Sequence, residues 1–263
     1  MKPPKDEAPI PGRFYCTFKV HKKYEEGKAP APRGFVSFLG TLTENIAIYV
    51  ENHIKELGQE HESYLQDTPD FLGHIQQLND DVDLPNNAML VVLNVISLYP
   101  NIPPTEGVKC VGDGLRGRPN TKFPAEFIER LLQIILDYSV FEFNGKKYQQ
   151  RFGTTMGTNP APSYANRFMA QEIDENICEI ALKYMENGEI PIRFMKIFLD
   201  DIFLIFFGSI KKLHLFFDEI NQLHQIYNVS HNIRIRKKNA TCMPLYTFRS
   251  NPISRYLLPY KGR

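Results

Sequence analysis

The stretch "IFLDDIFLIFFG", residues 197–208, sets two adjacent carboxylates, Asp200 and Asp201, between two almost purely apolar halves. Both halves are rich in Ile and Phe, which favour β-strands, so the stretch predicts a hairpin with the carboxylates at its tip. Burying a carboxylate is costly unless something pairs with it. Two interpretations are open: a solvated acidic turn, or a pair of metal ligands that the apolar strands hold at a sheet edge.

Length and composition limit the remaining possibilities. The 263 residues suffice for one large domain or two small ones, and 43% of them are hydrophobic. The net charge of +1 neither favours nor excludes a polyanionic partner, so a nucleic-acid binder would need a local basic face. The four cysteines form no C-x-x-C pair, which predicts reduced thiols in an intracellular protein and no zinc site. No apolar run reaches the roughly 18 to 20 residues of a membrane span.

The apolar periodicity predicts an alternation of strands, helices and hairpins. Strands are expected in residues 14–20, 33–38 and 88–95, and in the hairpins 140–153 and 192–208. Helices are expected in residues 43–57, 68–78, 103–114, 123–140 and 211–227, and after the Gly-rich loop 153–163. This order indicates an α+β protein rather than a doubly wound sheet.

Several details follow from local residue types. Thr43 is a candidate cap of the first helix, and Asn144-Gly145 fits a type I′ turn. The third helix should begin at Pro103 or Pro104 and stop near Gly112 or Gly114. The second helix is expected to bury one face, lined by Phe71, Leu72, Ile75 and Leu78.

Five stretches in order resemble the motifs of the reverse transcriptases of Penelope-like retroelements, relatives of telomerase. They are "RFYCTFKVHK", "APRGFVSFLGTLTENIAIYV", "LPNNAMLVVLNVISLYPNIPPTEG", "FGTTMGTNPAPSYANRFM" and "FLDDIF". The resemblance implies a polymerase fingers-palm architecture whose antiparallel palm sheet is backed by helices. It assigns residues 1–87 to an N-terminal extension and fingers and 88–263 to the palm, with a hairpin at about 140–152 bordering the fingers. No thumb or GIY-YIG endonuclease domain is recognised after these motifs.

The resemblance also implies a site for two Mg²⁺ ions, with Asp200, Asp201 and the motif A position as ligands. The family has aspartate at that motif A position, where this chain has Asn94. Asparagine keeps one carbonyl acceptor but loses the negative charge that a ligand bridging two cations needs. We therefore expect severely impaired polymerisation. If the alignment holds, the side chain of Asn94 should lie within about 4 to 5 Å of Asp200 across adjacent strands.

Other residues receive roles only through the same resemblance. The nucleotide-binding candidates are Tyr99, Arg33, Lys19, Gly153 and Gly157, and the template- or primer-binding candidates are Lys22 and Ala161. Each has a plainer alternative: Tyr99 as a core tyrosine, the small residues as a loop before a helix, the basic residues as a solvated loop. The run "RIRKK", residues 234–238, could bind phosphate or be a solvated run.

Three hypotheses for function remain open. The first is a reverse-transcriptase-like enzyme with a crippled metal site, whose partners would be an RNA template, a DNA primer and dNTPs. The second is a pseudoenzyme that binds nucleic acid without chemistry, and the third is a decayed fragment. The family implies a nuclear location, and no membrane partner is expected.

Overall fold

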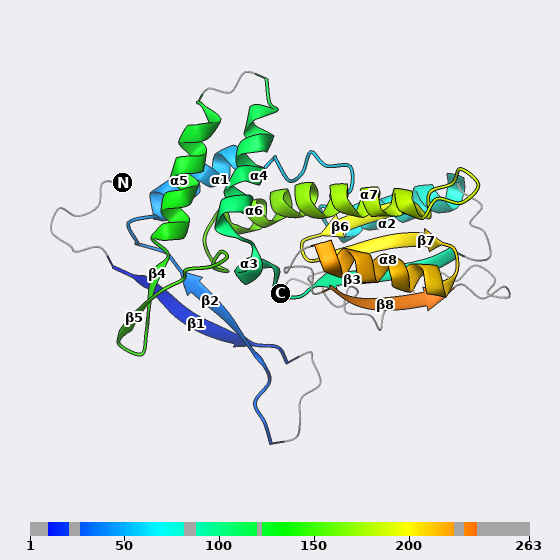
Figure 1. Ribbon diagram of the computed structural model, residues 1–263. Helices are drawn as coiled ribbons and strands as arrows, with labels where there is room; N and C mark the ends of the chain where they lie inside the picture. Colours follow the sequence, from blue (N-terminus) through cyan, green and yellow to red (C-terminus); the bar gives the residue numbers. More distant parts are fainter. Residues whose placement is uncertain (1–9, 21–26, 82–87, 120–122, 224–228, 236–263) are drawn as a thin grey trace. The chain divides into compact units, whose positions relative to one another are not determined.

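The computed structural model describes residues 10–20, 27–81, 88–119, 123–223 and 229–235 (Figure 1). The chain forms two compact units, each built from two separate segments: Met1–Gly58 with Ser97–Phe168, and Gln59–Ile96 with Met169–Arg263. No helix in the described ranges is long and apolar enough to cross a membrane. The fold is α+β, as predicted, with one four-stranded sheet in each unit.

The described residues form the strands β1 (Gly12–Phe18), β2 (Pro32–Ser37), β3 (Ala88–Val95), β4 (Val140–Phe143), β5 (Lys146–Gln149), β6 (Ile192–Phe198), β7 (Asp201–Phe207) and β8 (Val229–Ile235). They form the helices α1 (Glu44–Ile54), α2 (Thr68–Asp81), α3 (Leu98–Asn101), α4 (Pro104–Arg116), α5 (Ala125–Asp137), α6 (Ala161–Phe168), α7 (Glu175–Lys183) and α8 (Ile210–Leu223), with a π-helical stretch, η1 (Met169–Asp174), between α6 and α7. The predicted domain boundary after residue 87 falls between α2 and β3, which both belong to the second unit.

The sheet of the first unit has the strand order β2-β1-β4-β5. β1 is antiparallel to β2 and parallel to β4, and β4 and β5 form the predicted hairpin. Asn144 and Gly145 connect them with φ of 50° and 71°, so both residues adopt the positive φ that a type I′ turn requires. Local turn chemistry was therefore sufficient to predict this hairpin.

Helix ends were predicted less well than helix positions. Thr43 does occupy the N-cap of α1, but its side chain makes no capping hydrogen bond. α4 does not stop at Gly112 or Gly114; it continues to Arg116. Both glycines lie inside the helix. The side chain of Glu129 on α5 occupies the space beside Gly112, and that of Arg167 on α6 occupies the space beside Gly114. That prediction was wrong because the glycines serve close packing rather than helix termination.

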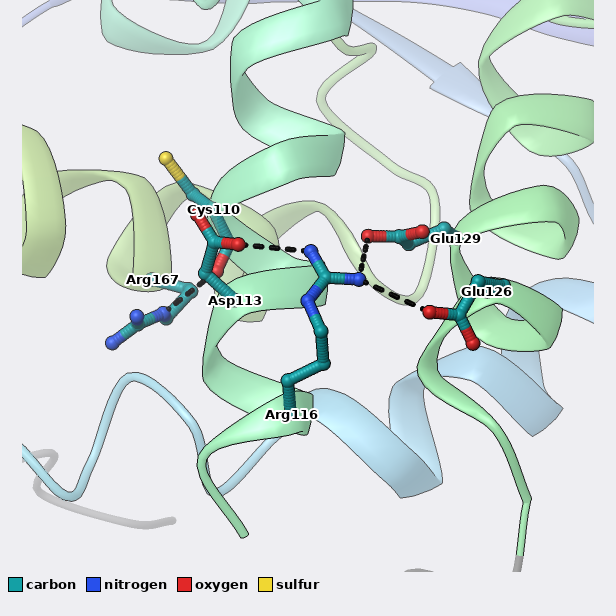
Figure 2. A network of polar contacts seen from close by, with 6 residues as sticks. All are labelled: Cys110, Asp113, Arg116, Glu126, Glu129 and Arg167. Atoms are coloured by element: carbon teal, nitrogen blue, oxygen red, sulfur yellow. Dashed lines mark hydrogen bonds and ion pairs between the residues drawn. The ribbon is translucent and has the colours of Figure 1, made fainter.

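An ionic network joins α4 to α5 on the surface of the first unit (Figure 2). The Arg116 guanidinium donates to Asp113 Oδ1 at 2.8 Å, to Glu129 Oε1 at 3.0 Å and to Glu126 Oε1 at 3.5 Å. In the same view Arg167 Nε donates to the carbonyl of Cys110 at 3.0 Å, which ties α6 to α4. These contacts link α4 to α5 and to α6.

Arg116→Ala should lower the free energy of unfolding by about 1 kcal/mol or less, because the arginine side chain is 43% exposed and solvent screens its ion pairs. Urea unfolding measures this change. Lys109→Ala, on the same helix and also exposed, is the matched control and should change stability by less. A loss above about 2 kcal/mol would mean that the network behaves as a buried one.

The sheet of the second unit has the order β6-β7-β3-β8, and all neighbouring pairs are antiparallel. Phe203 and Ile205 of β7 pack with Phe71 and Ile75 of α2 on one face. The alternate residue Phe206 points the other way and contacts Phe216 of α8, with ring centroids 5.5 Å apart. β7 is therefore covered on both faces, which explains its continuous apolar run.

Two further features of the second unit bear on the predictions. Leu72, expected on the buried face of α2, is instead 52% exposed. The outer edge of β6 is paired with the segment around Tyr64: Leu65 N donates to the carbonyl of Ile197 at 3.0 Å, and Ile197 N donates to the carbonyl of Ser63 at 2.7 Å. This pairing holds the acidic hairpin on its outer side.

Candidate active site

The acidic hairpin consists of β6, a two-residue turn and β7, as predicted. β6 ends at Phe198, and β7 begins at Asp201, which pairs with Phe198. Leu199 and Asp200 form the turn, and Leu199 has φ of 54°, in the left-handed region that costs a non-glycine residue about 1–2 kcal/mol. The antiparallel pairing of β6 with β7, whose central residues are buried, closes this turn and holds Asp200 and Asp201 at the end of the sheet.

Asn94 lies beside both carboxylates on the neighbouring strand. The register of β3 against β7 sets Asn94 opposite Asp201, and Val95 N donates to the carbonyl of Asp200 at 2.8 Å. The Asn94 side chain donates from Nδ2 to Asp201 Oδ1 at 2.7 Å and to Asp200 Oδ2 at 3.4 Å. The sequence-based prediction that Asn94 and Asp200 meet across adjacent strands is confirmed.

The electrostatics of this cluster centre on Asp201. Burial raises the pKa of Asp201 to about 6, the hydrogen bond from Asn94 opposes the rise, and the negative charge of Asp200 adds to it. The Asn94 amide, as a hydrogen-bond donor, therefore favours the ionised form of Asp201.

The raised pKa of Asp201 makes stability depend on pH. Because the pKa of Asp201 is higher in the folded than in the unfolded protein, protonation of Asp201 stabilises the fold. This contribution to the free energy of unfolding is complete below about pH 4 and is lost as pH rises through about 6. The loss should be about 2–3 kcal/mol, at 1.36 kcal/mol per pKa unit. Urea unfolding in EDTA at acidic and neutral pH, compared between wild type and Asp201→Asn, isolates it. Identical pH slopes in the two proteins would contradict the raised pKa.

The side chains present do not fit a two-ion Mg²⁺ site. Mg²⁺ takes oxygen ligands, and two ions need a carboxylate that bridges them. Within the described residues no group of three or more His, Cys, Asp and Glu side chains is placed to hold a metal. Asn94 completes the cluster, but it faces the carboxylates with Nδ2, a donor, rather than with its carbonyl oxygen. The Asn94 amide thus contacts the negatively charged carboxylates of Asp200 and Asp201, which a cation would otherwise contact.

The remaining candidate residues lie in the first unit. Tyr99 belongs to α3, Arg33 to β2, and Lys19 follows β1 directly. Ala161 begins α6 and is 1% exposed, and Lys22 lies outside the described residues. Their roles toward nucleotide and template stay predictions, as does phosphate binding by residues 234–238, of which only the first two are described.

The two loop glycines have a role within the chain itself. Gly153, with φ of 67°, lies against the backbone of Pro100, and the next residue, Thr154, donates its N–H to the carbonyl of Tyr99 at 2.8 Å. Gly157, with φ of 127°, lies against the carbonyl of Val36 in β2. A side chain at either position would meet backbone atoms, so both glycines permit close approach of the chain to itself.

Sequence analysis did not single out the aromatic side chains of the β4–β5 hairpin. Their signal was the alternation in "VFEFNGKKYQ", where Phe141, Phe143 and Tyr148 fall on one face. The Asn144-Gly145 turn signal drew attention to the turn of this hairpin instead.

Comparison with known proteins identifies the fold. No family model matches the chain, and no curated protein matches it. Solved structures do: apo telomerase from Candida tropicalis, truncated from its C-terminal domain, has a TM-score of 0.58 at 8% identity over 86% of this chain and 50% of that one. Telomerase from Candida albicans, in complex with a TWJ fragment of telomeric RNA, has a TM-score of 0.60 at 8% identity over 88% and 44%.

A viral enzyme has the same architecture. The BmCPV RNA-dependent RNA polymerase in its quiescent state matches with a TM-score of 0.55 at 10% identity, over 85% of this chain and 20% of that one. The chain has a polymerase fold. It spans half or less of the length of these structures, and at such low identity the likeness concerns the fold alone.

Proposed function

We propose that the chain is a reverse-transcriptase-like domain of the Penelope-like kind, with impaired nucleotidyl transfer. In this proposal the sheet β6-β7-β3-β8 is the palm sheet, and the sheet of the first unit belongs to the fingers. The observation that carries the proposal is the position of Asn94: it donates to Asp201 and Asp200 from the strand where the family has its bridging aspartate.

The proposed impairment follows from charge. Two carboxylates that share one amide donor hold less negative charge than three carboxylates, so they attract divalent cations less. If the lost ligand stabilises the transition state by several kcal/mol, the rate falls by many powers of ten, since each 1.36 kcal/mol is tenfold. The substrates of the residual activity would be an RNA template, a DNA primer and dNTPs, with Mg²⁺ as the ion of the intact family site.

Primer extension on an RNA template in Mg²⁺ tests this proposal. Wild type should extend the primer barely or not at all, and Asn94→Asp should gain at least about a hundredfold. Asp200→Asn in the Asn94→Asp background is the control and should abolish the gain. Robust synthesis by wild type would refute the impairment.

A pseudoenzyme that only binds nucleic acid is the second candidate. The amide of Asn94 favours it, because it satisfies the carboxylates within the protein. This function predicts salt-dependent binding of an RNA–DNA duplex that Asp200→Asn leaves unchanged, and no extension by Asn94→Asp. Absence of duplex binding at low salt would remove it.

A further inference from the structure

The sheet of the first unit ends in an open edge strand. β5 is the last strand in the order β2-β1-β4-β5, and all four of its residues are exposed (Figure 1). The two-residue turn makes Phe143 and Lys146 a hydrogen-bonded pair, and such pairs alternate from there along the hairpin. The backbone N–H and C=O groups of Lys147 and Gln149 therefore point away from β4, toward the open edge.

This edge is held in place and is unpaired. The N–H of Gln150 donates to the carbonyl of Ser139 at 3.0 Å, and the Gln149 side chain donates to the carbonyl of Asp137 at 2.6 Å. Within the described ranges of the chain, no group bonds to the outward backbone groups of Lys147 and Gln149. An open edge of this kind is a template for one more strand, and its order lowers the entropy that binding costs.

The side chains along this edge are basic on both faces of the sheet. Lys146 shares a face with Phe143, Lys147 lies on the other face, and Arg151 follows the strand. β5 contains no acidic residue, and neither lysine forms an ion pair with any residue that the structure describes. A strand that adds to the edge has side chains on both faces, so it meets both lysines. The charge of the edge therefore favours an acidic strand.

Tyr148 adds an apolar contact between the basic positions. Its side chain is 45% exposed, and its ring stacks on that of Phe141 with centroids 5.7 Å apart. In an antiparallel addition, the residue opposite Tyr148 shares the face of this ring, so an aromatic side chain there would pack on it. The next two residues of the added strand lie opposite Lys147 and Lys146, where carboxylates would form cross-strand ion pairs.

We propose that β5 binds an acidic, extended segment of a partner protein, which adds to the four-stranded sheet as an antiparallel fifth strand. The backbone hydrogen bonds would supply affinity, and the side chains opposite Tyr148, Lys147 and Lys146 would supply specificity. A second copy of the chain fits poorly, because it would bring two basic strands together. Residues 236–263 fit no better, since they contain basic residues but no Asp or Glu. The edge needs no nucleotidyl transfer, so the proposal goes beyond the proposed function.

A synthetic peptide with the sequence Val-Thr-Phe-Glu-Glu-Gly, labelled with fluorescein, tests this proposal in an anisotropy titration with the full chain. Its phenylalanine would lie opposite Tyr148, and its glutamates opposite Lys147 and Lys146. The peptide should bind, and replacement of both glutamates by lysine should raise Kd about tenfold or more. Absence of binding by the acidic peptide would overturn the proposal, because the two lysines would then only protect the edge against pairing.

Methylation of single peptide amides separates strand addition from plain charge attraction. In the antiparallel arrangement, the amide of the glutamate opposite Lys147 faces β5, whereas that of the phenylalanine faces away. A methyl group on the nitrogen of that glutamate should therefore abolish binding, and one on the nitrogen of the phenylalanine should leave Kd close to that of the parent peptide. Equal Kd values for the two methylated peptides would contradict strand addition. This comparison leaves the protein unchanged, so folding cannot confuse it.

Lys146→Glu tests the site from the side of the protein. Lys146 is the position of choice because it pairs with Phe143, whereas Lys147→Glu would face Glu142 across the hairpin. The substitution should raise Kd for the acidic peptide about five- to tenfold, and a peptide with lysine opposite this position should regain the affinity. Lys211→Glu, at an exposed residue of α8, is the matched control and should change neither Kd. A wild-type dimer that the peptide leaves intact would also overturn the proposal, because a second copy would then cover the edge.

Discussion

Asn94→Asp should unfold more easily than wild type in EDTA and should recover stability in Mg²⁺. The substitution replaces the donor Nδ2, which contacts Asp201 and Asp200, with a third carboxylate. Losing hydrogen bonds to charged groups costs about 1.5–3 kcal/mol, and the repulsion of a third negative charge adds to this loss. A cation that binds the folded variant at about a hundred times its Kd would restore about 2.7 kcal/mol.

Urea unfolding at neutral pH, in EDTA and in millimolar MgCl₂, measures both effects. Wild type should respond little to Mg²⁺. Asn45→Asp is the matched control: it adds the same charge at an exposed position on α1 and should not respond to the ion. A variant as stable as wild type in EDTA would mean that the amide of Asn94 does not neutralise the carboxylates.

Gly157→Ala should lower the free energy of unfolding by about 3 kcal/mol or more. Its φ of 127° is strained for any residue with a side chain, and the added methyl group would meet the carbonyl of Val36. That carbonyl cannot move away freely, because the N–H of the same residue donates to the carbonyl of Met156 at 2.9 Å. Strain and overpacking each contribute on the order of 1–3 kcal/mol.

Gly73→Ala is the control for Gly157→Ala. Gly73 lies within α2, and a methyl group there would meet only open space, so the substitution should raise stability by about 0.5–1 kcal/mol. Urea unfolding of both variants gives the comparison. If Gly157→Ala were as stable as wild type, the loop would not lie against β2 as described.

The sequence predicted the part of the site that local patterns control. Two apolar runs around Asp200 and Asp201 indicated a hairpin, and the apolar run that contains Asn94 indicated a further strand. The structure confirms that these segments pair. Apolar runs and strand length predict the strands themselves, whereas the expectation that Asn94 lies beside Asp200 came from the motif resemblance.

Long-range packing decided the features that the sequence could not reveal. Gly112 resembled a helix stop because glycine commonly ends helices. The Glu129 carboxylate that lies beside it belongs to another helix, so the local sequence does not reveal this packing. The two units were hidden because each combines segments from separate parts of the chain. The direction of the Asn94 amide was not predicted either, since loss of charge is visible in the sequence but the hydrogen bonds that replace it are not.

The number of divalent ions that the chain binds tests the central claim most directly, that Asn94 rather than a pair of cations neutralises Asp200 and Asp201. Titration with Mn²⁺, followed by electron paramagnetic resonance, counts bound ions in wild type, Asn94→Asp and Asp200→Asn. We expect at most one weakly bound ion in wild type, a second ion in Asn94→Asp, and none in Asp200→Asn. Two tightly bound ions in the wild-type chain would contradict the account.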